Sequence, residues 1–237
     1  MKILLIRHGD PDYTIDSLTE KGWREAKLLS NRLEKLEIRD FYVSPLGRAR
    51  ATAQPTLEKL NRTAEVLPWL AEFRGWVEDP FGQPEPQHRI PWNLMPQYWT
   101  KFPELFDRDH WMEHPLMTTG TLRQIVQETN EGVDALLERY GYKRDGMIFH
   151  TENNTTDTIC LVCHYGVGMA ILSRLLGVAL PVLWGSFMLP TTSVTTLVTE
   201  ERVPGEVFFR CFQMGDTAHL YAGGEPNSQA GMFKEKL

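Results

Sequence analysis

The chain has 237 residues, of which 42% are hydrophobic and 24% charged, so it can bury a sizeable core. Its 25 Lys and Arg residues against 31 Asp and Glu residues give a formal charge of −6, which argues against a general nucleic-acid-binding surface. No apolar stretch approaches the ~20 residues of a membrane-spanning helix, and the apolar run after Lys2 is too short for a signal peptide. We therefore expect a cytoplasmic protein with neither nucleic-acid nor membrane partners, and the sequence favours no particular oligomeric state.

The first predicted element is an apolar strand from Ile3 to Ile6 that ends abruptly in Arg7, His8 and Gly9. Gly9 is the residue type that lets a backbone turn sharply or come close to a ligand. Further on, Ser44 and Pro45 predict a helix start, with Ser44 as N-cap. Apolar spacing predicts helices at about 20–36, 45–60, 119–140 and 167–176, and strands at about 3–6, 40–43, 64–67, 147–150, 158–163, 193–199 and 207–214.

Alternation of strands and helices predicts a single three-layer α/β/α sandwich over residues 1–237 with a mostly parallel central sheet. The last two strands are joined by a short Pro-Gly turn, which adds an antiparallel edge. Cys160 and Cys163 lie three apart in one predicted strand, so they face opposite sides of the sheet. We therefore expect buried thiols there and neither a disulfide nor a zinc site.

Residues 73–117 differ from the rest of the chain. They hold four of the seven tryptophans and seven prolines, and their charges are mixed. Long excursions within a compact domain are often lids or binding loops. We expect a cap inserted into the domain, with short helices and aromatic walls that shape a pocket.

The strand that ends in His8 has a counterpart, because the strand at 158–163 ends in His164, Tyr165 and Gly166. If the two strands are adjacent and parallel, both imidazoles emerge at one edge of the sheet, where helix N-termini favour anions. Arg48, in the first turn of the helix after Ser44, would lie at the same edge. Arginine binds phosphate through two parallel hydrogen bonds, so this set indicates phosphoryl transfer.

With these residues in their order, the sequence resembles the histidine phosphatase superfamily, also called the phosphoglycerate-mutase-like clan. The resemblance covers nearly the whole chain except 73–117. It rests on Arg7-His8-Gly9, Leu18-Thr19-x-x-Gly22, Ser44-Pro45-Leu46-x-Arg48-Ala49-x-x-Thr52-Ala53, Glu72, Cys163-His164-Tyr165-Gly166-Val167 and Gly215-Asp216-Thr217-Ala218-His219-Leu220.

The resemblance implies that His8 is the nucleophile that carries the phosphoryl group and that Glu72 gives and takes the proton. It implies that Arg7, Arg48 and His164 hold the phosphoryl oxygens, and we add Tyr165 to this phosphate-binding set. No metal or other cofactor is expected, because the arginines and histidines supply the positive field. The expected substrate is a small-molecule phosphate monoester, with a phosphoprotein as a second candidate.

The chain also departs from the family pattern. Asp10 follows Arg-His-Gly where Glu, Gln or Thr is common, Tyr165 replaces a frequent glycine, and Thr191 and Thr192 stand where an Asn is often found. The motif Glu-Arg-His-Tyr-Gly that mutase members carry around the acid is missing, which favours a phosphatase over a mutase. Glu78 and Asp79 are alternative positions for the acid.

Three alternatives remain open at this point. The chain could be a phosphoglycerate-type mutase, or a non-catalytic module that binds phosphate or a partner. His110-Trp111-Met112-Glu113-His114 also matches the H-x-x-E-H pattern of zinc hydrolases, although Pro115 disfavours a helix there. His88, His150 and His219 are interpreted as structural or exposed, with His219 able to approach the active edge.

Overall fold

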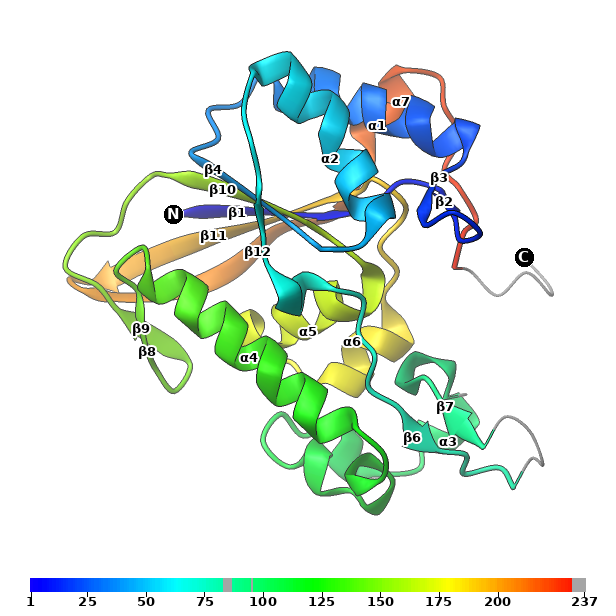
Figure 1. The fold of residues 1–237 in the computed structure, drawn as a ribbon. Helices are drawn as coiled ribbons and strands as arrows, with labels where there is room; N and C mark the ends of the chain where they lie inside the picture. The colour runs from blue at the N-terminus through cyan, green and yellow to red at the C-terminus, as the bar shows by residue number, and fades with distance from the viewer. Residues whose placement is uncertain (83–86, 95, 232–237) are drawn as a thin grey trace.

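A computed structural model describes residues 1–82, 87–94 and 96–231, and in this part of the chain the centre is an eight-stranded sheet (Figure 1). The strand order is β5-β4-β10-β1-β11-β12-β9-β8. The strands are β1 (Lys2–Arg7), β4 (Asp40–Val43), β5 (Glu65–Val66), β8 (Lys143–Asp145), β9 (Ile148–His150), β10 (Thr158–Cys163), β11 (Val194–Val203) and β12 (Glu206–Asp216). A separate short hairpin is formed by β2 (Pro11–Asp12) and β3 (Ser17–Leu18).

The strands β5, β4, β10 and β1 are parallel, whereas β11, β12, β9 and β8 continue the sheet in antiparallel fashion. The predicted three-layer α/β fold is confirmed, and the predicted Pro-Gly turn does join two antiparallel strands, β11 and β12. That hairpin is not the edge of the sheet, because β9 and β8 pair beyond it. The antiparallel part is therefore larger than the sequence indicated.

Helices cover both faces of the sheet (Figure 1). On one side lie α1 (Glu20–Leu33), α2 (Gly47–Leu60) and α7 (Ala218–Ala222), and on the other α4 (Leu122–Glu138), α5 (Tyr165–Leu176) and α6 (Leu180–Ser186). Successive residues of β1 enter different cores: Leu4 packs with α1 and α2, and Leu5 packs with α5. Cys160 lies in the same core as Leu4, and Cys163 lies in the same core as Leu5. Both are buried free thiols, as expected from their spacing.

The segment 73–117 lies beside α4 and α6 and consists of short elements, with residues 83–86 and 95, including two of its prolines, outside the described part. Its tryptophans Trp99 and Trp111 are buried in the same core as α5. Its elements are β6 (Val77–Glu78), β7 (His88–Arg89), α3 (Pro96–Trp99) and single 3-10 turns at Pro91–Asn93, Pro103–Phe106, Trp111–Glu113 and Pro115–Thr118. No helix in the described residues is long and apolar enough to cross a membrane.

The sequence-based N-cap at Ser44 is wrong. Helix α2 begins at Gly47, and its cap position, Leu46, has no side-chain cap bond. The cap comes from a distant loop instead, because Asp16 Oδ2 accepts the Gly47 N–H at 2.7 Å. Ser44 is thereby left available for a different contact.

Candidate active site

The two histidines meet at the carboxyl ends of neighbouring strands. β1 and β10 are parallel, with Arg7 opposite Cys163, and the His8 N–H donates to the Cys163 carbonyl at 2.9 Å. The ring centroids of His8 and His164 are 5.0 Å apart, with an angle of 58° between the ring planes. Both residues are buried, so the two strand tips bring their imidazoles together in the interior of the protein.

His8 has one defined tautomer. Its Nδ1 lies 2.7 Å from the Gly9 carbonyl oxygen, which can only accept, so Nδ1 carries the hydrogen and Nε2 keeps its lone pair. Burial, and after it the charge of Arg7, lowers the pKa of His8 to about 3. At neutral pH the ring is therefore uncharged, with a free nitrogen able to attack an electrophile.

The backbone after His8 is held by tight packing against α1. A Cβ on Gly9 would lie 3.0 Å from the Gly22 carbonyl, and one on Gly22 would lie 2.2 Å from the Asp10 carbonyl. The Gly9 N–H also donates to Thr52 Oγ1 at 2.8 Å. Gly9 thus serves close approach to another part of the chain, whereas the sequence suggested approach to a ligand.

Arg7 directly precedes His8 at the end of β1 and is 5% exposed. Its Nη1 donates to the Leu189 carbonyl at 2.6 Å, and its Nη2 donates to the Ala230 carbonyl at 2.9 Å. The guanidinium carbon is 5.9 Å from the centre of the Tyr165 ring. Carbonyls from two distant segments therefore fix the plane of Arg7.

Arg48 is the second residue of α2 and is 9% exposed. Its Nη1 donates to Asp16 Oδ1 at 2.6 Å, and its guanidinium carbon lies 5.4 Å from the centre of the Tyr13 ring. Asp16 binds both Arg48 and the start of α2, so the β2–β3 hairpin holds this arginine in place. The sequence reasoning missed Asp16, because no local pattern connects it to α2.

Glu72 lies where α5 begins. Its Oε1 accepts the N–H groups of Phe73 at 2.8 Å, Gly166 at 3.0 Å and Val167 at 3.3 Å. Oε2 has no hydrogen-bond partner among the described residues. Burial raises the pKa of Glu72, whereas these N–H groups, Arg7 and Arg48 oppose that rise. The carboxyl group is thus oriented, and its proton-bearing form is favoured more than in water.

Three buried nitrogens of this cluster have no partner in the described protein: Arg7 Nε, Arg48 Nε and His164 Nδ1. Buried polar groups are almost always hydrogen-bonded, so three unpartnered nitrogens in one cluster favour an acceptor from outside the chain. A bound oxyanion would supply several acceptor oxygens at once.

Tyr165 differs from the expectation in one respect. Its hydroxyl lies 2.9 Å from the Trp184 carbonyl and 3.0 Å from the Phe187 carbonyl, and it can only donate to them. That hydroxyl is therefore already committed to the protein. A phosphate contact by residue 165 would have to use its backbone N–H, and this stays a prediction.

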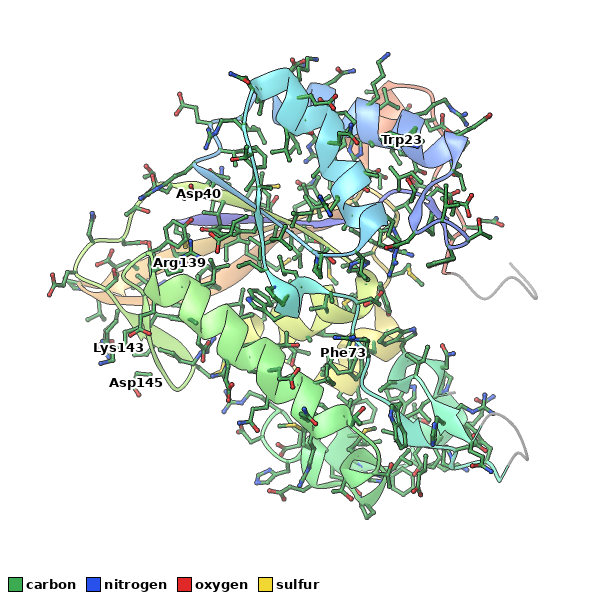
Figure 2. All side chains as sticks on the ribbon, viewed as in Figure 1. Trp23, Asp40, Phe73, Arg139, Lys143 and Asp145 are labelled. Atoms are coloured by element: carbon green, nitrogen blue, oxygen red, sulfur yellow. The ribbon has the colours of Figure 1, made fainter. Side chains whose placement is uncertain are left out.

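Aromatic rings pack together next to Glu72 in the chain, beginning with Phe73, which is labelled in Figure 2 and packs against Trp92 and Trp184. The ring centroid of Trp92 lies 5.7 Å from the ring centroid of Tyr165 and 5.7 Å from that of Trp184. The Trp92 ring packs directly on the first turn of α5, since a Cβ on Gly166 would be 2.4 Å from it and 2.9 Å from Glu72 Oε1. Part of the 73–117 segment therefore reaches the candidate acid.

The loop residues that depart from the family pattern are used within the protein. Thr191 donates to the buried Glu25 at 3.0 Å, and the Thr192 N–H donates to the His8 carbonyl at 3.2 Å. Asp10 accepts hydroxyl hydrogens from Thr19, at 2.6 Å, and from Ser228. These side chains brace the loop after β1.

The other candidate positions lie elsewhere. Glu78 is exposed, and Asp79 pairs with Arg89 at 2.7 Å, so neither replaces Glu72 beside α5.

The H-x-x-E-H alternative needs both histidines on one helical face. The structure has only a 3-10 turn at Trp111–Glu113, with the side chain of His110 60% exposed and that of His114 4% exposed. His219 is buried and contacts Thr192 Oγ1 at 3.2 Å.

Comparison with known proteins places the chain in a family. It matches the model of the histidine phosphatase superfamily (branch 1) over residues 3–209, and it belongs to this superfamily. Phosphoserine phosphatase 1 of Hydrogenobacter thermophilus is 26% identical over 213 residues, which are 85% of this chain and 88% of that protein. A 2,3-bisphosphoglycerate-dependent phosphoglycerate mutase of Thermoplasma acidophilum is 42% identical over 73 residues, 26% of this chain and 36% of that protein.

Solved structures show the same fold. A phosphoserine phosphatase mutant from Entamoeba histolytica, in complex with phosphoserine, has a TM-score of 0.58 at 20% identity, covering 92% of this chain and 98% of that one. A mycobacterial glucosyl-3-phosphoglycerate phosphatase has a TM-score of 0.61 at 17% identity, covering 91% and 99%. Both likenesses, at 20% identity or less, show that the chain has this fold.

Proposed function

We propose that this protein is a phosphomonoester hydrolase that works through a phosphohistidine on His8 and needs no metal ion. The observation that carries the proposal is a set of buried nitrogens without partners in the described protein, Arg7 Nε, Arg48 Nε and His164 Nδ1, beside the imidazole of His8. Donors fixed in a buried site stabilise the charge on the equatorial oxygens of a transferring phosphoryl group.

The reaction has two steps. His8 Nε2 bonds to phosphorus while the ester P–O bond breaks, and Glu72 gives its proton to the departing alkoxide. A water then bonds to phosphorus, its proton passes to Glu72, and the P–N bond breaks to release inorganic phosphate. The buried carboxyl suits both roles, because its raised pKa keeps the proton bound to a higher pH than in water.

For the substrate, we propose a small organic phosphate monoester whose alcohol part meets the aromatic wall that includes Trp92. The support is the position of that ring against the same turn of α5 that holds Glu72. The relatives named as phosphoserine phosphatases put phosphoserine on the list of compounds to test. The buried free thiols favour the cytoplasm as the place of action.

The test is a panel of phosphomonoesters, phosphoserine among them, given to the wild type and to His8→Ala. We expect the wild type to release inorganic phosphate and His8→Ala to lose about 10³-fold or more of its turnover, because the covalent route is closed. An acid-labile phosphoenzyme should be trapped in the wild type alone. Full turnover by His8→Ala would overturn the assigned nucleophile.

A mutase is the second candidate, favoured by the 42% identity to the Thermoplasma mutase over 73 residues. It predicts transfer of the phosphoryl group within a phosphoglycerate with little free phosphate. A protein inert toward every phosphoester would instead favour a phosphate-binding module.

A further inference from the structure

Ser44 forms a buried hydrogen bond to the second histidine. It follows β4, which pairs in parallel with β10, and its N–H donates to the Val162 carbonyl at 3.0 Å. Its Oγ lies 2.7 Å from His164 Nε2, and both residues are fully buried. The tips of β4, β10 and β1 therefore present Ser44, His164 and His8 in a row.

Ser44 is free to make this bond because it does not cap α2. Asp16 Oδ2 accepts the Gly47 N–H instead, and among the described residues the Ser44 oxygen accepts one backbone N–H, that of Leu46, at 3.2 Å. A hydroxyl has one hydrogen and two lone pairs. The hydrogen of Ser44 is therefore available for His164.

Burial lowers the pKa of His164, so its imidazole ring is neutral. A neutral imidazole carries one hydrogen, on either Nδ1 or Nε2. Nε2 faces Ser44, and Nδ1 is buried without a partner in the described protein, like Arg7 Nε and Arg48 Nε. If Nδ1 carried a lone pair, it would repel an oxyanion bound at this cluster. If it carries the hydrogen, it is a third donor beside the two arginines.

We propose that Ser44 is a positioning residue that donates its hydroxyl hydrogen to His164 Nε2 and so fixes the tautomer in which Nδ1–H points to a phosphoryl oxygen. The inference rests on the proposed function for the identity of the anion. The direction of the Ser44–His164 bond can be measured without any turnover.

The decisive measurement is long-range ¹H–¹⁵N NMR of histidine-labelled wild-type protein near neutral pH, with His164 assigned by its loss in His164→Gln. We expect a protonated, pyrrole-type Nδ1 and an unprotonated, pyridine-type Nε2 for His164. A protonated Nε2 and a bare Nδ1 in the wild type would overturn the proposal. A wild type inactive on all phosphoesters would overturn the proposed function and leave this result standing.

Variants then test the consequence. Ser44→Ala should shift His164 toward the other tautomer, weaken competition by inorganic vanadate and lower kcat by about 10- to 100-fold, the range found when partners that orient metal-bound histidines are removed. Ser44→Thr, which keeps the hydroxyl, should retain the wild-type tautomer signature.

Ser30→Ala is the matched control. Ser30 is also buried, and its hydroxyl donates to the Pro55 carbonyl at 3.1 Å between α1 and α2, away from His164. It should lose stability without changing the His164 signals or vanadate binding. If Ser44→Ala behaves like Ser30→Ala, with unchanged tautomer and unchanged vanadate binding, Ser44 has a structural role only and the proposal fails.

Discussion

The two ends of the parallel strands both carry arginines, but they differ in how the donors of those arginines are buried and paired. At the amino end, near Asp40 (Figure 2), Arg39 and Arg62 line an open groove of about 810 Å³. Arg39 pairs with Asp157 at 2.5 Å, and Arg62 donates to backbone carbonyls. At the carboxyl end, the donors of Arg7 and Arg48 are buried and partly unpaired.

This difference shows that neither the size of a hollow nor the number of charges identifies the site. The groove at the amino end is roomy and basic, yet neighbouring groups already accept hydrogen bonds from its exposed arginines. Donors that are buried without acceptors carry a desolvation penalty that a bound acceptor would remove. Three sets of substitutions test whether the two ends differ in this way.

The largest effect is expected from a matched pair of arginine substitutions. Arg48→Ala should lower kcat/KM by about 10²- to 10³-fold, because a fixed donor to the phosphoryl oxygens is lost. Arg39→Ala, at the amino end and 55% exposed, should leave kcat/KM unchanged. Steady-state kinetics on the best substrate of the panel checks both.

Arg48→Lys refines that experiment. Lysine keeps the charge but cannot copy the planar guanidinium, so little activity should return. Equal losses of kcat/KM in Arg48→Ala and Arg39→Ala would mean that the buried Arg48 contributes no more to catalysis than the exposed Arg39.

A second effect, about 100-fold for alkyl phosphates, is expected for Glu72→Gln. An alkoxide leaves poorly without a proton, whereas nitrophenolate needs little help. The variant should therefore lose much less activity on p-nitrophenyl phosphate than on phosphoserine. The raised pKa of Glu72 also predicts that its ionisation forms the basic limb of the wild-type pH–rate profile, and this limb should vanish in Glu72→Gln.

Equal losses of Glu72→Gln on the alkyl and the aryl ester would remove Glu72 from the acid role. Glu78→Gln is the control, because Glu78 is exposed and lies in the same segment. It should match the wild type on both substrates.

The smallest effect concerns stability. The pKa of His8 is about 3 in the folded protein and near its ordinary value of 6.5 in the unfolded chain. Between these values the unfolded chain binds the extra proton, so the free energy of unfolding falls as the pH drops below about 6.5. His8→Gln removes this contribution, and denaturant titrations should show a shallower loss of stability over that range.

An unchanged slope in His8→Gln would mean that His8 is accessible to protons in the folded protein. The arginines at the amino end of the sheet do not add to this effect, because they stay charged throughout this range.

Much of the site could be predicted from local sequence. Apolar runs that end in Arg7-His8 and Cys163-His164 predict two buried strands, and adjacent parallel strands deliver their next residues to one edge. The position of Arg48 in the first turn of a helix was also correct. Ser44 was misread, because Ser-Pro is typical of a helix start and nothing nearby in the sequence shows that Asp16 caps α2 instead.

The alternation of strands and helices, and the apolar positions that they bury, follow from periodicity over a few neighbouring residues and can be read from the sequence. The hydrogen-bond partners depend on how the chain folds: Asp16 with Arg48, Ala230 with Arg7, Ser44 with His164 and the start of α5 with Glu72. These pairs join residues 32 positions apart or more, and directional contacts between distant segments leave no periodic trace in the chain.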